Sequence, residues 1–174
     1  QAAKVMVFSS VAILLSKFPS FRQGKGLHFF CSQKDSLNLR SFKKNSMYKN
    51  TKTVSADEAV KVLKSGDHVH LSSVASVPQI LVEAMCRRGD AGELRDVHIH
   101  HLHTEGAAPY TEPRYEGIFQ HDAFFVGGNV RKNVQAGYAD YIPVFLSETQ
   151  RLYREGYLKC NVAMIQVCPP DEHG

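Results

Sequence analysis

Short β-type runs alternate with helical patterns from residue 53 onward, and this alternation limits the possible folds more than any other feature of the chain. The predicted strands span residues 67–71, 96–102, 123–126 and 161–167. The predicted helices span residues 55–64, 78–89, 130–136 and 147–154. Strands that alternate with helices are typical of βαβ units, whose parallel strands form a sheet with helices packed on it. The sequence therefore predicts an α/β domain with a mainly parallel sheet and covering helices over residues 53–174.

Local signals place the ends of these helices. Ser55 and Glu58 form a capping box, in which the Ser55 hydroxyl accepts from the Glu58 amide at the start of the first helix. Gly66 ends that helix, and Pro78 suits the first turn of the second. Ser147 opens a second box of the same kind three residues before a glutamine, so we expect the last helix to begin there.

The charge of the chain is divided between its two parts. Residues 1–50 hold nine Lys/Arg and one acid, a balance of +8, whereas residues 51–174 hold twelve Lys/Arg and sixteen acids, a balance of −4. The predicted domain is therefore mildly acidic and lacks the basic stripe that neutralises phosphates. We expect no nucleic-acid partner.

The first 52 residues have the composition of a mitochondrial transit peptide, which is basic, serine-rich and poor in acids. The apolar run from Val5 to Leu15 is eleven residues long, too short for a membrane span of roughly 20 residues. Lys4 before this run makes a secretory signal the rival reading, and an unstructured or mistranslated extension is a third. We expect a transit peptide or disordered leader over residues 1–52 and a location in the mitochondrial matrix.

Neither the cysteines nor the histidine-rich run predicts a metal site. The four cysteines, at 31, 86, 160 and 168, have the spacing of neither a disulfide framework nor a zinc site and suit reduced thiols. In the strand 96–102, His98 and His100 share one face, while His101 and His103 share the other. Two imidazoles per face leave a zinc site incomplete. His103, at the end of this strand, is the one histidine that we expect in a ligand cleft.

Ligands of parallel sheets bind outside the carboxyl ends of the strands, so the candidate site loops are 72–77, 103–110, 127–131 and 168–174. The turn Ser72-Ser73-Val74 leaves backbone amides accessible next to a helix N-terminus and suits an oxyanion, although an ordinary tight turn also fits. Gly127, Gly128 and Asn129 form another strand-to-helix turn without a nucleotide fingerprint, and its glycines also fit backbone geometry alone.

Read together, several stretches resemble the amino-terminal domain of the acetyl-CoA hydrolase/transferase family, especially 4-hydroxybutyrate CoA-transferases. The early stretches are Ser55–Val60, Lys64–Asp67 and Val77–Met85. The middle stretches are His103–Gly106, Ala108–Tyr110 and Asn129–Arg131. The most specific are Ala139–Glu148 and Pro169–Gly174. The order and spacing of these motifs over residues 53–174 carry the resemblance.

The resemblance implies an enzyme with two related α/β domains that face each other across a cleft. In this family a glutamate of the second domain attacks the acyl-CoA thioester, and a glutamyl-CoA thioester then passes CoA to a carboxylate such as 4-hydroxybutyrate. By position, Ser72, Ser73 and Val74 would form the oxyanion turn of the first domain. Coenzyme A thioester would be a substrate, and no cofactor would be bound permanently.

The same resemblance places the glutamate nucleophile beyond residue 174, because Glu105, Glu116 and Glu148 stand in no matching motif. The chain starts at Gln1 and ends in a loop, so we expect a truncated amino-terminal half, inactive alone, that lacks a carboxy-terminal domain. A homodimer is the expected oligomeric state. A hydrolase of the same family and a non-catalytic fragment remain as alternatives.

Overall fold

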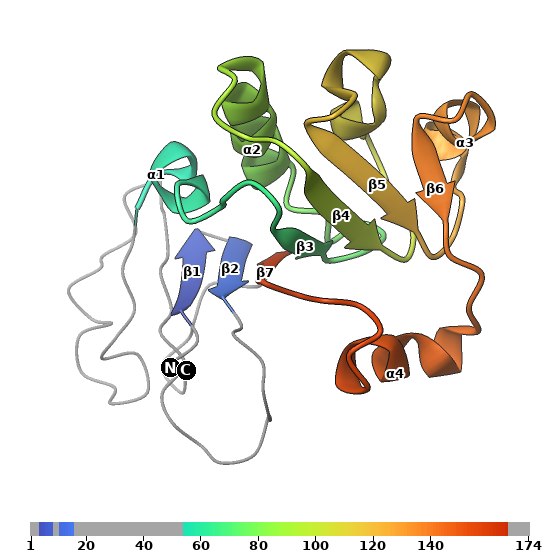
Figure 1. Cartoon of the computed structure of the whole chain (residues 1–174). Coiled ribbons are helices and arrows are strands. Elements are labelled where there is room, and N and C mark those ends of the chain that lie inside the picture. Colours follow the sequence, from blue (N-terminus) through green and yellow to red (C-terminus); the bar gives the residue numbers. More distant parts are fainter. Residues whose placement is uncertain (1–3, 9–10, 16–53, 167–174) are drawn as a thin grey trace.

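The computed structural model describes residues 4–8, 11–15 and 54–166 (Figure 1). The strands are β1 Lys4–Phe8, β2 Val11–Leu15, β3 His68–Leu71, β4 Val97–His101, β5 Phe119–Ala123, β6 Ala139–Tyr141 and β7 Val162–Gln166. The helices are α1 Ala56–Val60, α2 Gln79–Asp90, α3 Gly128–Gln135 and α4 Thr149–Arg154. Three short 3-10 helices add η3 Pro109–Thr111, η4 Pro113–Tyr115 and η5 Leu146–Glu148. In these residues we find no helix long and apolar enough to cross a membrane.

The strands form a sheet in the order β1-β2-β7-β3-β4-β5-β6. The five strands from β7 to β6 are parallel, which confirms the predicted α/β fold with a mainly parallel sheet. The chain runs outward from β3 to β6 and then returns to β7 on the opposite side of β3. The strand order therefore reverses between β3 and β7, and ligands of such sheets bind outside the carboxyl ends of the strands at a reversal of this kind.

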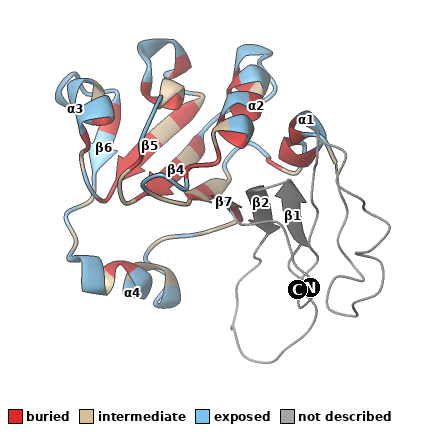
Figure 2. Cartoon of the chain, turned by 180° about the vertical axis from the view of Figure 1, so that it is seen from behind, coloured by how far each residue is buried: buried red, intermediate tan, exposed pale blue. Residues whose placement is uncertain are grey.

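Helices lie on both faces of the parallel sheet. Figure 1 shows α1, α2 and α3 on one face, with α4 on the other. The face under α1 and α2 carries the hydrophobic core, whose strand residues are Val69, Leu71, Val97, Ile99, Phe119, Val162 and Met164. Leu81, Ala84 and Met85 of α2 belong to the same core and are completely buried. Figure 2 shows that α2 carries both buried and exposed residues. Full burial of a Leu or Met side chain contributes about 1.5–3 kcal/mol, so these contacts stabilise the packing of α2 on the sheet.

The first helix follows the predicted cap but is shorter than expected. Ser55 Oγ accepts a hydrogen bond from the Glu58 amide at 3.2 Å, as the capping box requires. The helix ends at Val60, because the Arg88 guanidinium of α2 reaches over and donates to the carbonyls of Val60 and Leu63. Arg88 therefore satisfies carbonyls that a longer helix would have used, and it ties α1 to α2.

Three further elements differ from the sequence-based expectation. The strand expected at 123–126 lies earlier, at 119–123, because Gln120 and Asp122 on its polar face hide the strand pattern. The box at Ser147 is wrong: Ser147 lies within η5, and α4 starts at Thr149 without a side-chain cap. β6, which spans only three residues, was not predicted.

The segment expected to be a leader contributes two of the strands. β1 and β2 pair antiparallel, and β2 then pairs antiparallel with β7 at the edge of the parallel sheet. The remainder of residues 1–52 lies outside the described residues, so the transit peptide stays a prediction. The candidate loop 168–174 also lies outside them.

Candidate active site

The turn after β3 sits where the strand order reverses, and its two serines are engaged in holding it there. Ser72 Oγ donates to the Ser76 carbonyl and accepts from the Gln166 amide of β7 at 3.1 Å. Ser73 Oγ accepts from the Leu102 amide, just after β4, at 3.3 Å. The two hydroxyls therefore join the turn to both neighbouring strands. The Ser72 and Val74 amides donate to the Met164 and His103 carbonyls, so within residues 72–74 the Ser73 N–H and O–H are the donors that remain for a ligand.

Val74 is held in a conformation that few β-branched residues adopt. Its φ is +56°, in the left-handed region, and its side chain is 51% exposed. Such a backbone costs about 1–3 kcal/mol and persists only where the surroundings impose it. Here Val74 N–H donates to the His103 carbonyl at 2.6 Å, and its carbonyl accepts from the Glu105 amide at 3.3 Å. The strained turn is thus fixed to the segment after β4.

His103 lies at the carboxyl end of β4, as expected, and packs against the turn after β5. Its Nε2 lies 3.3 Å from Glu105 Oε1, and its ring meets that of Phe125 edge-on with the centroids 5.6 Å apart. A Cβ on Gly127 would come within 2.9 Å of His103 Cδ2. Gly127 is therefore required for this close approach, independently of any ligand.

Asn129 connects the start of α3 to the segment after β4. Its Nδ2 donates to Thr104 O at 3.0 Å, to Thr104 Oγ1 at 3.2 Å and to Gly106 O at 3.0 Å. Gly127 is the N-cap of α3 and offers no side chain, and Gly128 faces open space. The first amides of α3 form the electropositive end of this helix, which lies next to His103.

The structure thus brings Val74, His103, Gly127 and Asn129 together at the carboxyl edge of the sheet. Two neighbours were missed by sequence reasoning: Thr104, which is 2% exposed and pairs with Val74 in a parallel bridge, and Gln79 of α2. Thr104 lies in the family-like stretch His103-Thr104-Glu105-Gly106, which was the signal that could have identified it, whereas the sequence analysis predicts only His103 of that stretch as a site residue. The arrangement offers backbone donors and a strained turn, which suit binding of an anionic oxygen.

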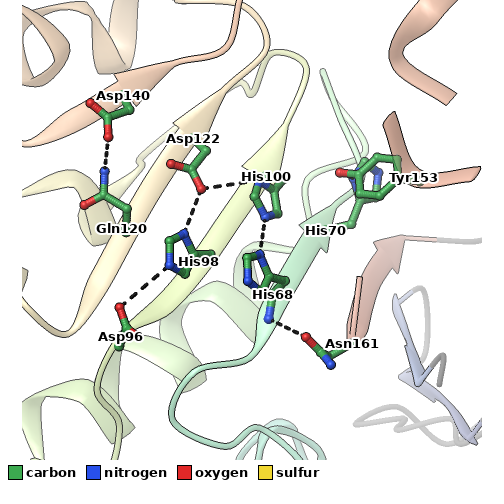
Figure 3. Close-up of polar contacts among 10 residues, drawn as sticks. All are labelled: His68, His70, Asp96, His98, His100, Gln120, Asp122, Asp140, Tyr153 and Asn161. Carbon is green, nitrogen blue, oxygen red and sulfur yellow. Dashed lines mark hydrogen bonds and ion pairs between the residues drawn. The ribbon is translucent and has the colours of Figure 1, made fainter. Parts of the chain in front are cut away.

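The sheet face under α4 is polar, with histidines on adjacent strands (Figure 3). His98 Nδ1 donates to Asp122 Oδ2 at 2.9 Å, and His68 Nδ1 lies 2.9 Å from His100 Nε2. Burial, followed by electrostatic repulsion from His98, lowers the pKa of His68. Burial lowers the pKa of His100 to about 3. Tyr153 of α4 covers this face.

Tyr153 is the contact that joins α4 to the histidine face. Its hydroxyl lies 3.1 Å from His70 Nδ1, and its ring meets those of His70, His100 and Phe124 edge-on. Burial raises the pKa of the Tyr153 hydroxyl and lowers the pKa of His70. The pair is therefore neutral at ordinary pH and needs no counter-ion.

A second histidine pair lies on the opposite, core face. His101 and His121 stack with centroids 4.3 Å apart, and His101 Nε2 lies 2.9 Å from the Tyr110 hydroxyl. Both rings are completely buried, which lowers the pKa of His101 to about 2 and that of His121 to about 3. The placement of His98 and His100 on one face and His101 on the other confirms the predicted alternation.

Stacking also explains why the histidine face is not arranged as a metal centre. The rings of His68 and His98 are 4.5 Å apart and inclined by only 10°. Lone pairs of near-parallel imidazoles lie in separate planes, so they do not converge on one ion. Within residues 54–166, no group of three or more His, Cys, Asp or Glu side chains has the arrangement of a metal site.

Comparison with known proteins agrees with these features. The family described as acetyl-CoA hydrolase/transferase N-terminal domain matches residues 37–174. A succinyl-CoA:acetate/propanoyl-CoA:succinate CoA transferase of Fasciola hepatica is 39% identical over 118 residues, which cover 68% of this chain and 24% of that protein. The 4-hydroxybutyrate coenzyme A transferase of Clostridium kluyveri is 35% identical over 123 residues, covering 71% and 28%. This chain spans about a quarter of the length of these relatives.

Solved structures support the fold. RipA from Yersinia pestis superposes with a TM-score of 0.53 at 21% identity, over 59% of this chain and 26% of the RipA chain. At this identity the likeness supports the α/β fold alone. Together with the family match, which covers most of the sequence, it gives one conclusion: this chain belongs to the acetyl-CoA hydrolase/transferase family and carries its amino-terminal domain.

Proposed function

We propose that the protein containing this chain transfers CoA between a short acyl-CoA, such as acetyl-CoA, and a carboxylate such as 4-hydroxybutyrate. The observation that carries this proposal is the family match combined with relatives that are CoA transferases, at 33–39% identity. Four of the five names pair an acyl-CoA with a carboxylate, as in the butyryl-CoA:acetate CoA-transferase of Anaerostipes caccae. The thioester and the carboxylate are substrates, and no permanently bound cofactor is needed.

The proposed reaction is covalent and proceeds in two half-reactions. A glutamate carboxylate attacks the acyl-CoA carbonyl and expels the CoA thiolate, which leaves an acyl-glutamyl anhydride. The thiolate then attacks the glutamyl carbonyl, releases the acyl group as a carboxylate and leaves glutamyl-CoA. The acceptor carboxylate repeats these steps in reverse. We place this glutamate in the carboxy-terminal part that the relatives possess, across a cleft from the turn at Val74.

The described residues suit the complementary role of binding and orienting oxygen atoms. The Ser73 N–H of the Ser72–Val74 turn and the first amides of α3, at Gly128 and Asn129, lie on the same edge of the sheet as His103. Each carbonyl attack in the proposed cycle creates an oxyanion, and fixed donors in a site without water stabilise such charges strongly. Residues 72–74, 103 and 127–129 would form one wall of the cleft, with Glu105 beside His103 at its rim.

The direct experiment uses a protein that carries this chain and the carboxy-terminal part found in its relatives. Incubation with acetyl-CoA and 4-hydroxybutyrate, butyrate, propionate or succinate should give the new acyl-CoA and free acetate in equal amounts, as measured by liquid chromatography. Release of free CoA without a new acyl-CoA would instead identify a hydrolase, which the family name also covers. Formation of neither a new acyl-CoA nor free CoA would support a non-catalytic role.

We further propose a location in the mitochondrial matrix and assembly as a homodimer. The location rests on the +8 balance of residues 1–50, because a basic, acid-poor leader follows the membrane potential. Import into isolated mitochondria, with loss of the leader that requires the potential, would support this location. Protection of the intact chain inside secretory vesicles would contradict it. Light scattering of the purified protein measures the oligomeric state.

A further inference from the structure

The segment after β4, residues 103–107, has an unusual hydrogen-bonding pattern: each of its five consecutive backbone carbonyls accepts a hydrogen bond. The first carbonyl, that of His103, accepts from Val74 N–H at 2.6 Å. Asn129 Nδ2 donates to the carbonyls of residues 104 and 106, both at 3.0 Å. Gln79 Nε2 donates to those of residues 105 and 107, at 3.1 and 3.4 Å.

The two side-chain amides take alternate carbonyls, so together they hold the whole segment. Asn129 binds the even-numbered carbonyls and Gln79 the odd-numbered ones. Gln79 is the first residue of α2 and Asn129 the second of α3, so both amides are mounted on helices.

Gly106 allows this arrangement to close. Its φ is +80°, which favours glycine, and a Cβ at this position would lie 2.9 Å from Gln79 Nε2. Asn129 is also close to Gly127, whose added Cβ would lie 2.9 Å from Asn129 Oδ1. Both glycines therefore provide room for the amides.

The chemistry of the pattern points to a positioning role. Carbonyl oxygens that face a ligand repel carboxylates and oxyanions, whereas these carbonyls are turned toward the amides that donate to them. We propose that Gln79 and Asn129 are positioning residues: their side-chain amides clamp segment 103–107 and fix its conformation for the substrate carboxylate. This inference rests on the proposed CoA-transfer function, because it assigns these residues to that cleft.

Only a donor serves this purpose, which makes near-isosteric variants informative. Asn129→Asp and Gln79→Glu keep the shape but place an oxygen where the donor nitrogen was, so it faces the carbonyls. Gln79→Met removes the donor without adding charge and covers the case in which Gln79→Glu does not fold. Asn133→Asp is the matched control: it is the same substitution one turn along α3, and it loses a donor to Thr111 Oγ1 at 2.7 Å, away from the segment.

The test combines hydrogen exchange with kinetics on the protein that includes the carboxy-terminal part. Loss of the donors should speed exchange of the Val74 and Glu105 amides by about tenfold or more, because the bonds between residues 74 and 103–105 depend on the clamped conformation. It should also raise KM for the carboxylate by about tenfold, with a smaller change in kcat. Asn133→Asp should change neither the exchange nor the kinetics.

Unchanged exchange in all the Gln79 and Asn129 variants would overturn the clamp. Faster exchange with unchanged kinetics would show that the segment is clamped but does not serve the site, which overturns the positioning role. If the wild-type protein itself transfers no CoA between any pair of substrates, the proposed function fails, and with it the positioning role. The exchange measurement still reports separately whether the clamp exists.

Discussion

The buried histidines predict a steep loss of stability on mild acidification. His100, His101 and His121 are completely buried, and burial lowers their pKa values to about 3, 2 and 3 from 6.5. A histidine with a lowered pKa in the folded state binds protons more readily when the chain is unfolded. Its contribution to stability is therefore present above pH 6.5 and is lost as the pH falls toward the folded-state value.

The size of the effect follows from the unfolded-state pKa. Between pH 7.5 and pH 5.5 each of these histidines removes about 1.4 kcal/mol from the free energy of unfolding, and the three together remove about 4 kcal/mol. Within this pH range the loss is the same for any folded-state pKa below about 4.5. Because a domain of this size is stable by only about 5–15 kcal/mol, the change should be easily measured.

Urea unfolding followed by circular dichroism at pH 7.5 and 5.5 measures this change. His121→Gln replaces one of these rings with a side chain that does not titrate, so the loss between the two pH values should shrink by about 1.4 kcal/mol. Val130→Ala, at a buried position that does not titrate, should lower stability at both pH values and keep the full loss. A total loss below about 1 kcal/mol would refute the reasoning.

Three substitutions test individual parts of the structure. Gly127→Ala should lower the free energy of unfolding by about 1–3 kcal/mol, because its Cβ overpacks against His103. Gly128→Ala, which faces open space at the start of α3, should be neutral or stabilise by up to about 1 kcal/mol in the same urea titration. Val74→Gly should raise the midpoint of thermal unfolding, since relieving a left-handed strain of about 1–3 kcal/mol outweighs a glycine entropy cost of about 0.5–1 kcal/mol; a lower midpoint would contradict the strain. Tyr153→Ala should speed amide exchange in α4 and leave α2 unchanged, because Tyr153 joins α4 to the sheet; equal acceleration in both helices would indicate global unfolding instead.

The fold was largely predictable because its strongest signals are local. The cap at Ser55 and the alternation of His98 and His100 with His101 depend on residues close in sequence, and the structure confirms them. β5 was misplaced because its face under α4 is polar, so its sequence lacks the apolar run typical of a buried strand. β6 is too short for a periodic pattern.

The candidate site was less predictable because its organisation depends on distant contacts. Sequence reasoning selected Val74, His103 and Asn129 from their loops, and the structure brings all three to one edge of the sheet. It gave no sign that Val74 pairs with Thr104, or that the Asn129 amide turns toward a loop 25 residues earlier in the chain. Such pairings follow from how the strands pack side by side, which no local pattern encodes.

The central proposal is that this domain forms one wall of a CoA-transfer site whose nucleophile lies in the carboxy-terminal part. The most direct measurement is borohydride reduction of the protein after incubation with acetyl-CoA, followed by peptide mass mapping. Reduction of a glutamyl-CoA thioester converts one glutamate side chain to an alcohol. We predict a single modified glutamate outside residues 1–174. Modification of Glu105, Glu116 or Glu148, or CoA transfer without any modified glutamate, would contradict the proposal.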